Sequence, residues 1–153
     1  MIIVCYQTAK LDIILFVSTR NVFLNFSKDF FLDFIIGEQN IKVGLLVYTP
    51  ADEYLFHLNS YVKKKDLLEA IDSVSKRQAL PTRSPHFLTR LRSMFTVENG
   101  DRKAVTNVVV IISLEASLIN MTDFKRETDL AMKEGISIYI YNFRWFKSHQ
   151  YFK

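Results

Sequence analysis

The sequence of 153 residues contains little cysteine, glycine and proline, and each shortage excludes a class of protein. Its one cysteine, Cys5, has no partner within the chain, which excludes a small fold held together by internal disulfides. Four Gly and three Pro are too few for a collagenous or low-complexity chain. No stretch reaches the roughly 18 consecutive apolar residues of a membrane-spanning helix, so we expect no membrane span.

The sequence also has a small net charge and no clear secretory signal. The net charge of +4, with a pI near 9.2, is too small to indicate a nucleic-acid partner, although it is compatible with acidic glycans as partners. The amino terminus is not a clean secretory signal, because Gln7, Lys10 and Asp12 interrupt its apolar stretch. If the protein is extracellular, we expect its signal peptide to lie outside this sequence.

Motifs of enzymes are missing as well. The sequence has no Gly-rich phosphate loop, and its three histidines show no metal-ligand spacing. Neither Ser18 nor Cys5 stands in a sequence setting typical of a catalytic nucleophile. A small α/β enzyme or nucleotide-binding domain is therefore the least favoured of the alternatives considered.

The sequence has instead an abundance of short apolar runs. Runs of this length are typical of strands that are buried on both faces of a sheet. Alternating apolar residues from Tyr54 through Phe56 to Leu58 predict a further strand with one wetter face. The four continuous runs are Leu11–Val17, Ile41–Tyr48, Val108–Ile112 and Ile136–Tyr141.

Four segments between the strands place apolar residues at helical spacing and so predict helices. Gly37 and Gly135 are predicted to end the first and the last of them, and Glu98–Asp101 is predicted to be a loop. The predicted helices are Phe26–Ile35 with Asn25 or Ser27 as its cap, Leu67–Val74, Phe87–Phe95 with Ser84 as its cap and Pro85 as its first residue, and a helix capped by Thr122 or Asp123.

The alternation of strands and helices predicts one doubly wound α/β domain, with an open, mostly parallel, Rossmann-like sheet covered on both faces. The link between the second strand and the strand at Tyr54–Leu58 is too short for a helical crossover, so we predict one antiparallel edge strand. We assign the domain to residues 11–143, with 1–10 as an N-terminal flank and 144–153 as a tail. In sheets of this class, ligands bind beyond the carboxyl ends of the strands, where the strand order reverses.

Several segments between Asp12 and Tyr141 resemble the von Willebrand factor type A (vWA) family, in order and at similar spacing. The family's opening strand, which runs into an Asp-x-Ser-x-Ser metal motif, is matched by DIILFVSTRNV, and the strand that ends in Thr-Asp-Gly is matched by VVVIISLEAS. The resemblance is closest to extracellular-matrix members, such as the A domains of collagen VI and matrilins. The other matching segments are IKVGLLVYTPADEYLFHLNSYVKKKDLLEAIDSV, LPTRSPHFLTRL and KEGISIYIY.

The resemblance implies a degenerate metal-ion-dependent adhesion site, one that has lost key ligands of Mg²⁺. The family's site takes one Asp and two Ser from the first loop, a Thr from a middle loop and an Asp from the end of the fourth strand. Magnesium needs near-octahedral oxygen coordination, and both Asp positions are substituted here, so we expect metal binding to be lost and no cofactor to be present. The Asp position of the first loop falls on Ser18, its two Ser positions fall on Arg20 and Val22, Thr82 keeps the middle-loop Thr, and Leu114, between Ser113 and Glu115, takes the place of the second Asp.

The resemblance therefore implies a secreted, extracellular and non-enzymatic adhesion module that binds protein partners, above all matrix components, without a metal. A structural spacer domain with a decayed binding site is the main alternative. The chain stops soon after the segment that resembles the family's fifth strand, so the resemblance also implies a chain truncated at its C-terminus.

Several residues admit both a functional and a plain interpretation. Arg20 either fills the vacant cation position and pairs with Glu115 or is a solvated loop arginine. Cys5 either is an inert thiol or, as the resemblance implies, forms a disulfide with a missing segment. The tail with Trp145 and Phe146 either docks on a surface or is left uncovered by truncation.

A basic face could bind acidic glycans, although runs of charge are usually only solvated surface. The residues of this face are Lys63, Lys64, Lys65, Arg77, Arg83, Arg90 and Arg92.

Overall fold

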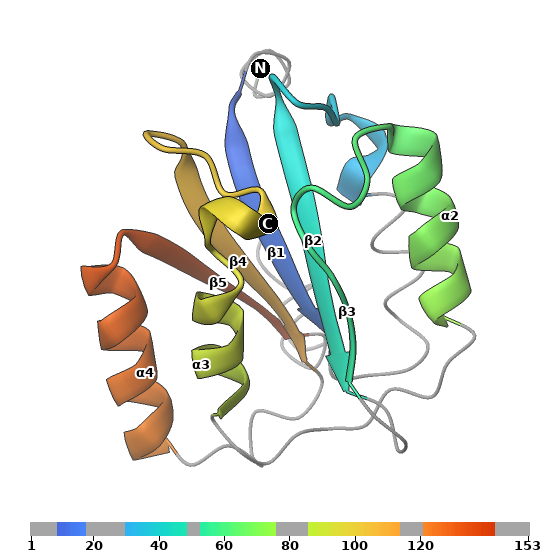
Figure 1. The fold of residues 1–153 in the computed structure, drawn as a ribbon. Helices are drawn as coiled ribbons and strands as arrows, with labels where there is room; N and C mark the ends of the chain where they lie inside the picture. Colours follow the sequence, from blue (N-terminus) through green and yellow to red (C-terminus); the bar gives the residue numbers. More distant parts are fainter. Residues whose placement is uncertain (1–8, 18–29, 49–52, 76–85, 114–120, 143–153) are drawn as a thin grey trace, which may run out of the picture.

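Five strands form one sheet in the computed structural model, which describes residues 9–17, 30–48, 53–75, 86–113 and 121–142 (Figure 1). The strand order is β3-β2-β1-β4-β5, with β1 at the centre. The elements are β1 (Leu11–Val17), β2 (Ile41–Tyr48), β3 (Glu53–Phe56), α2 (Lys64–Ser75), α3 (His86–Ser93), the 3₁₀ helix η2 (Val97–Asn99), β4 (Thr106–Ser113), α4 (Met121–Lys133) and β5 (Ile136–Asn142).

The pairing of the strands confirms the predicted fold class. Strand β1 is parallel to both β2 and β4, and β4 is parallel to β5. Strand β3 lies antiparallel to β2 at one edge of the sheet. The chain returns directly from β2 into β3 without a helix, and such a short connection can join two strands only by reversing direction. The structure is therefore a mostly parallel, Rossmann-like sheet with one antiparallel edge strand.

Side chains of β1 explain why its sequence is apolar without interruption. Ile13 and Leu15 belong to a buried cluster that includes residues of α2. Ile14 and Phe16 belong to a second cluster, which includes residues of α3 and α4. Because successive residues of a strand point to opposite faces, helices on both faces bury every one of these side chains. Each is at most 3% exposed, and burying one such side chain stabilises the fold by about 1.5–3 kcal/mol.

A buried ion pair anchors the amino end of β1. The carboxylate of Asp12 is fully buried, and its Oδ1 accepts hydrogen bonds from Nε and Nη2 of Arg102 at 2.9 and 2.6 Å. The same guanidinium donates to the backbone carbonyls of Leu11, Glu38 and Asn40. One arginine therefore joins β1, the entrance to β2 and the segment before β4, at the end of the sheet opposite to the predicted site.

The first predicted helix ends earlier than its apolar spacing indicates. It is described only from Phe30 and is helical as far as Leu32, well before Gly37. The Lys64 ammonium group donates hydrogen bonds to the carbonyl oxygens of Leu32 and, at 3.1 Å, of Phe34. A cation bound to the last carbonyls stabilises the end of a helix at this point, and sequence spacing alone did not reveal it.

Two other boundaries also differ from prediction. Strand β3 ends at Phe56 rather than at Leu58, because the chain turns where the backbone N–H of His57 donates to the hydroxyl of Ser60 at 3.0 Å. Leu58 is still fully buried, so its apolar character reflects the core rather than the strand. Helix α4 begins at Met121, one residue before the predicted cap. The predicted caps of the first and third helices lie outside the described residues: Asn25, Ser27, Ser84 and Pro85.

The predicted loop Glu98–Asp101 contains most of the 3₁₀ helix η2. Thr96 caps it, since its side-chain oxygen accepts the N–H of Asn99 at 3.3 Å. Gly100 ends it in the left-handed conformation, with φ of 95°. The carbonyl of Gly100 accepts a hydrogen bond from the ammonium group of Lys42 at 3.3 Å, which ties this turn to β2. Within the described residues, no helix has both the length and the apolar character needed to cross a membrane.

Candidate functional site

The carboxyl ends of β1 and β4 lie side by side, at the lower edge of the sheet in Figure 1. Val17, the last residue of β1, is the register partner of Ile112. After β1 the chain is next described at Phe30, which packs on the α2 face, whereas after β4 it is next described as α4, which packs on the opposite face. The strand order therefore reverses between β1 and β4, and this is the position at which open α/β sheets bind ligands.

Stacked aromatic rings hold the beginnings of α3 and α4 against this end of β1. The ring of Phe16, the residue before Val17, stacks on that of Phe87 with centroids 4.3 Å apart and planes 12° from parallel. The ring of Phe87, at the start of α3, lies 6.4 Å from that of Phe124 in the first turn of α4. The first turns of α3 and α4 therefore pack together at the carboxyl end of β1.

In the chain, the predicted adhesion-site positions lie next to the ends of β1 and β4 and shortly before α3. Ser113 is the last residue of β4 and the register partner of Asn142 in β5. Since Val17 and Ile112 are paired, the chain leaves β1 toward position 18 and leaves β4 toward position 114 from adjacent strands. The other predicted positions lie outside the described residues: Ser18, Arg20, Val22, Thr82, Leu114 and Glu115.

The residue types at these positions do not match the ligands that the resemblance implies for a divalent cation. None of Ser18, Val22 and Leu114 supplies a carboxylate, and Arg20 brings a fixed positive charge. Residues 18–28 contain no Asp, so a small shift of the assignment does not restore the first-loop motif. Among the described residues, no group of three or more His, Cys, Asp or Glu side chains could hold a metal ion. On this assignment the donor set does not fit Mg²⁺.

The described residues of the predicted basic face are divided between the two faces of the sheet, which corrects the prediction of one continuous surface. Lys64 and Lys65 belong to α2, and Arg90 and Arg92 belong to α3, whose core residues pack in the other cluster. Arg90 is also paired, since its Nη2 lies 2.7 Å from a carboxylate oxygen of Glu53. The remaining residues are Lys63, which precedes α2, and Arg77 and Arg83, which lie outside the described residues.

Arg92 takes part in a network that joins α3 to α4. Its Nη1 lies 3.1 Å from Glu127, its Nε donates to Glu134 at 2.9 Å, and the hydroxyl of Thr89 donates to Glu127 at 2.9 Å. The hydrogen bonds from Arg92 lower the pKa of the Glu134 carboxyl below its ordinary value, and they raise the pKa of the guanidinium in turn. Glu127 and Glu134 therefore neutralise the charge of Arg92, which the sequence analysis had assigned to the glycan-binding face.

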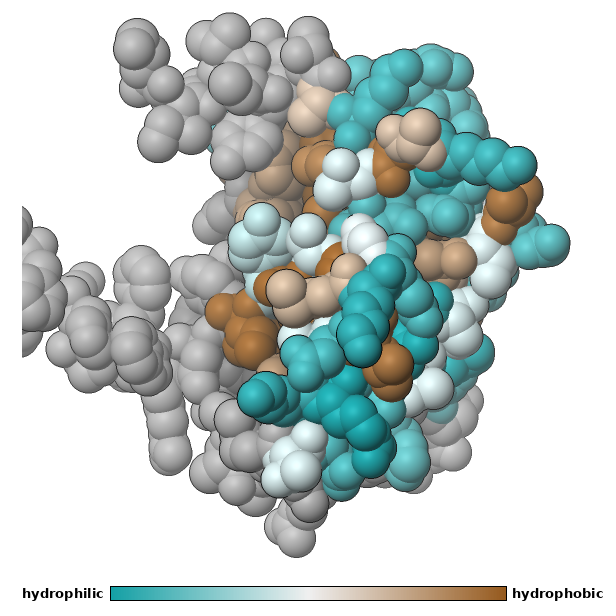
Figure 2. Space-filling model, turned by 90° about the vertical axis from the view of Figure 1, so that its left-hand side faces the viewer, coloured by the Kyte–Doolittle hydropathy of each residue, from teal (hydrophilic) through white to brown (hydrophobic). Residues whose placement is uncertain are grey.

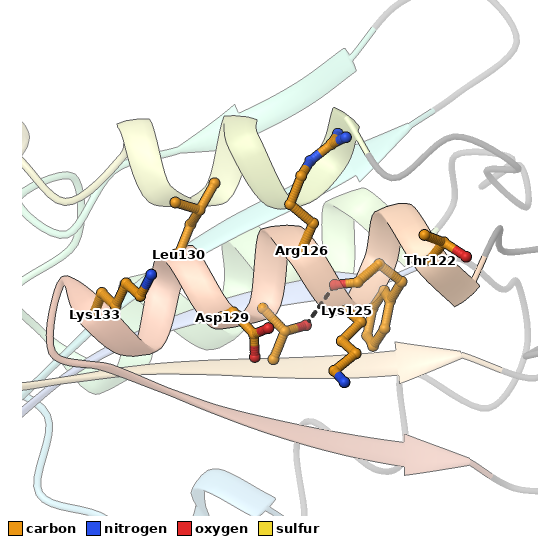
Figure 3. A pocket seen from close by; sticks show the side chains of 8 residues that line it. Thr122, Lys125, Arg126, Asp129, Leu130 and Lys133 are labelled. Carbon is orange, nitrogen blue, oxygen red and sulfur yellow. Dashed lines mark hydrogen bonds between the residues drawn. The ribbon is translucent and has the colours of Figure 1, made fainter.

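A groove of about 780 Å³ runs along the outer side of α4 (Figure 3). Basic side chains and one acidic side chain line the groove together, so its charge does not favour a ligand of one sign. The hydroxyl of Thr128 donates to the carbonyl of Phe124 at 2.8 Å, one helical turn earlier, so it is already satisfied. Sequence analysis did not single out this surface, because it is the polar side of an amphipathic helix. Its lining residues include Lys125, Arg126, Asp129, Leu130 and Lys133.

Two relatives are similar in sequence to part of the chain. Integrin alpha-11 of Mus musculus and integrin alpha-11 of Homo sapiens are each 30% identical to it over 97 residues. This match covers 63% of the chain and 8% of each integrin, so the chain corresponds to a small part of these relatives.

Solved structures of proximal thread matrix protein 1 (PTMP1) from the mussel byssus have a similar fold. One of them has a TM-score of 0.71 at 16% sequence identity and covers 88% of this chain and 38% of that chain. A second, in which the metal-ion-dependent adhesion site (MIDAS) motif is occupied by zinc, has a TM-score of 0.70 at the same identity and coverage. The model of the von Willebrand factor type A domain family matches residues 18–152, which is most of the chain. The chain therefore belongs to the von Willebrand factor type A domain family.

Proposed function

We propose that this domain is a non-enzymatic, adhesion-type module of the extracellular matrix that binds a protein partner at the carboxyl edge of its sheet without a divalent cation. The observation that carries the proposal is the pairing of Val17 with Ile112. Arg20 and Glu115 each follow one of these paired residues by three positions in the chain. A fixed cation and a carboxylate are thereby attached to adjacent strands at the switch point, where the family otherwise binds a metal.

Arginine is chemically suited to take over part of a bound cation's role. A guanidinium keeps its charge at every physiological pH and presents five N–H donors in a planar fork that matches a carboxylate. Arg20 can therefore pair with Glu115 in the free domain and with an acidic side chain of a partner in the complex. Such charge-assisted, bidentate hydrogen bonds are roughly twice as strong as neutral ones.

The proposed setting is supported by the nature of the relatives. One matching structure is that of a thread matrix protein, and the curated relatives are integrins. The sequence also resembles the A domains of collagen VI and matrilins. Because the chain matches only 8% of each integrin, the activities of those whole proteins do not transfer, and matrix proteins are proposed only as the class of partner.

Surface plasmon resonance against a panel of purified matrix proteins, including fibrillar collagens, fibronectin and laminin, tests the proposal. We expect saturable binding to at least one of them, with the same affinity in Mg²⁺ and in EDTA. Arg20→Glu is expected to weaken that binding by at least about tenfold, which corresponds to roughly 1.4 kcal/mol. The matched control is Arg126→Glu, a charge reversal on α4 at a side chain that is 63% exposed, which should leave the affinity unchanged.

Different failures separate the alternatives. If EDTA abolishes binding, the domain is metal-dependent and the proposed mechanism is wrong. If no matrix protein binds while the domain is folded by circular dichroism, a structural spacer becomes the better description. If Arg20→Glu and Arg126→Glu weaken binding equally, the carboxyl edge is not the recognition surface.

A further inference from the structure

Strand β5 presents an apolar edge. Within the described part of the chain it pairs only with β4, so its other side is the edge of the sheet. Its sequence, ISIYIYN, contains no charge, no Pro and no Gly. Tyr139 and Ile140 are 63% and 55% exposed, and Figure 2 shows apolar side chains at the surface of this side of the molecule, formed by α4 and β5. A long apolar edge of this kind is a template for pairing with another strand.

The opposite edge of the sheet shows how an unpaired edge is normally protected. Strand β3 has only four residues, and it carries Glu53, whose carboxylate is held by Arg90 at 2.7 Å. Short edge strands and charged side chains both prevent pairing with further chains. Since β5 has neither protection, its edge is suited to pairing.

Helix α4 carries two opposite charges on its side away from α3. Figure 3 shows the side chains of Lys125 and Asp129 on this side, whereas Arg126 and Leu130 point toward α3. Among the described residues, no side chain forms an ion pair with Lys125 or Asp129, although Arg126 is paired. Met132 follows Lys125 by seven residues, so it lies on the same side of the helix, and it is 64% exposed. This side of α4 therefore offers one cation, one anion and one apolar side chain for contact with another molecule.

We propose that β5 pairs with β5 of a second copy of this chain, antiparallel and about a two-fold axis, with the two α4 helices side by side. Dimers of this symmetry are the commonest oligomers, and in them the same surface of each subunit meets itself. With the axis at Tyr139, the middle residue of β5, all seven residues of one strand face residues of the other. Tyr139 then faces its own copy, and aromatic pairs of this kind stabilise antiparallel strands. Ile138 faces Ile140 of the second copy, and no charge of β5 meets its like.

The charges of α4 are complementary under the same symmetry, which favours a second copy over an unrelated partner. Helix α4 and β5 run in opposite directions and are joined by a short turn at Gly135 (Figure 1). From Ile136 to Tyr139 the strand advances by about 10 Å, which is the rise of about seven helical residues. The axis therefore passes near the middle of α4, between Lys125 and Asp129. Lys125 of each copy then faces Asp129 of the other, so the contact contains two ion pairs and no like charges.

An apolar groove reaches the same axis from the α2 face of the sheet. It has a volume of about 580 Å³, and its lining includes Val108 and Val110 of β4 and Tyr139 of β5. Tyr139 lies on this face because its register partner, Val110, belongs to the α2-side cluster. The ring of Tyr139 from the second copy therefore lies at the end of the groove, where it covers apolar surface that is otherwise exposed.

The dimer has a consequence for binding that rests on the proposed function. Because the strands of the two copies run in opposite directions, their carboxyl edges lie at opposite ends of the dimer. One dimer can then hold two partner molecules and join them. Dimerisation itself needs no partner, so it is measured on the purified chain alone and can fail while the proposed function holds.

Sedimentation velocity of the full chain between about 1 and 100 µM measures dimerisation, and we expect a monomer–dimer equilibrium within this range. Asp129→Lys brings two ammonium groups together at each contact and should raise the dissociation constant by at least about tenfold. Lys125→Asp combined with Asp129→Lys exchanges the two charges and should restore the wild-type constant. The matched control is Asp66→Lys, the same change at an exposed site of α2, which should leave the constant unchanged.

A second pair of variants tests the strand contact. Tyr139→Asp places two carboxylates face to face at the axis and should leave only monomer at about 100 µM. Val97→Asp is its control, because Val97 is 64% exposed on the 3₁₀ helix η2, and it should dimerise like the wild type. If circular dichroism shows that Tyr139→Asp is unfolded, the exchange of charges on the exposed side of α4 decides alone.

Three results would overturn the proposal. One is a wild-type chain that stays a monomer at about 100 µM. Another is protection of every β5 amide from hydrogen exchange at concentrations where the chain is a monomer, which would show that another part of the same chain covers the edge. The third is a double variant that dimerises as weakly as Asp129→Lys alone, or an Asp66→Lys control that is weakened as much, since the charges of α4 then do not face each other.

Discussion

Arg102 is predicted to be the single side chain on which the amino end of the sheet depends most. Its guanidinium makes five hydrogen bonds, two to the buried carboxylate of Asp12 and three to backbone carbonyls. The Asp12 carboxylate is fully buried and the Arg102 side chain is only 17% exposed, so water has little access to the bonds between them. In Arg102→Ala, the described donors of Asp12 are reduced to the backbone N–H of residue 102, which lies 2.9 Å from Oδ2.

The expected loss follows from the burial of the carboxylate that remains. Removing one partner of a buried ion pair typically destabilises a protein by about 3–5 kcal/mol, because the other charge stays buried and uncompensated. Domains of this kind are stable by about 5–15 kcal/mol in total. A loss of this size lowers the melting temperature by roughly 6–20 °C in a domain of about 150 residues. Arg102→Ala should therefore be folded only marginally, if at all, at 37 °C.

Urea denaturation followed by circular dichroism gives the free energy of unfolding of each variant. The control is Arg126→Ala, because its side chain is 63% exposed and lies 3.1 Å from Asp123 and 3.6 Å from Glu127, and it should lose at most about 0.5 kcal/mol. The double variant Asp12→Ala with Arg102→Ala should lose less than the sum of the single losses by at least about 1 kcal/mol, because no buried charge is left unpaired. A loss below about 1 kcal/mol in Arg102→Ala, or strict additivity in the double variant, would refute the reasoning.

Further predictions concern a glycine and a titrating carboxylate. Gly100→Ala should destabilise the domain by at least about 2 kcal/mol in urea denaturation, since φ is 95° and a Cβ would lie 2.7 Å from the backbone nitrogen of Asn59. Gly135→Ala, at φ of 79° with open space around the Cβ, should lose only about 1 kcal/mol, and equal losses in the two variants would contradict the steric argument. Hydrogen bonds from Arg92 lower the pKa of Glu134 in the folded state, so its contribution to stability is present at neutral pH and is lost as pH falls below about 4.3 and through the folded pKa. The stability difference between wild type and Glu134→Gln should therefore shrink in that acidic range, and a difference that is the same at pH 7 and at pH 3 would argue against the ion pair.

Much of the fold could be predicted because burial on both faces leaves a clear trace in sequence. Val108 and Val110 pack in the α2-side cluster, while Val109 and Ile111 pack in the cluster of α3 and α4, so β4 has no polar position between them. The antiparallel edge strand followed from the length of the link before it. Both inferences are local, since they need no knowledge of which strands become neighbours.

Features that depend on long-range contacts could not be predicted. Arg102 and Asp12 are 90 residues apart in the chain, and nothing in the sequence around either one indicates the other. The two halves of the predicted basic face were grouped by charge alone, and the sequence does not state that α2 and α3 lie on opposite faces of the sheet. The 3₁₀ helix η2 is a different case, because Thr96 three residues before Asn99 is a capping signal that sequence analysis could have used.

The sequence predicted the edge of the sheet at which the candidate site lies, but not the contacts of its individual residues. Open sheets with this order place their ligands at the switch point, and the register of Val17 with Ile112 confirms where that point lies. The assignment of individual positions, such as Ser18 and Leu114, rests on the resemblance to the family. Those positions lie outside the described residues, so their roles remain a proposal.

Binding of a divalent cation is the property that most directly separates a metal-independent site from a metal-dependent one. Isothermal titration calorimetry of Mn²⁺ into the wild-type domain should show no saturable binding, because neither position assigned to a metal-binding Asp, Ser18 or Leu114, holds a carboxylate and the site includes the cation Arg20. A variant combining Ser18→Asp, Arg20→Ser, Val22→Ser and Leu114→Asp, which keeps Thr82, should bind one Mn²⁺ ion per chain. Saturable binding of one Mn²⁺ ion by the wild-type domain would contradict the account.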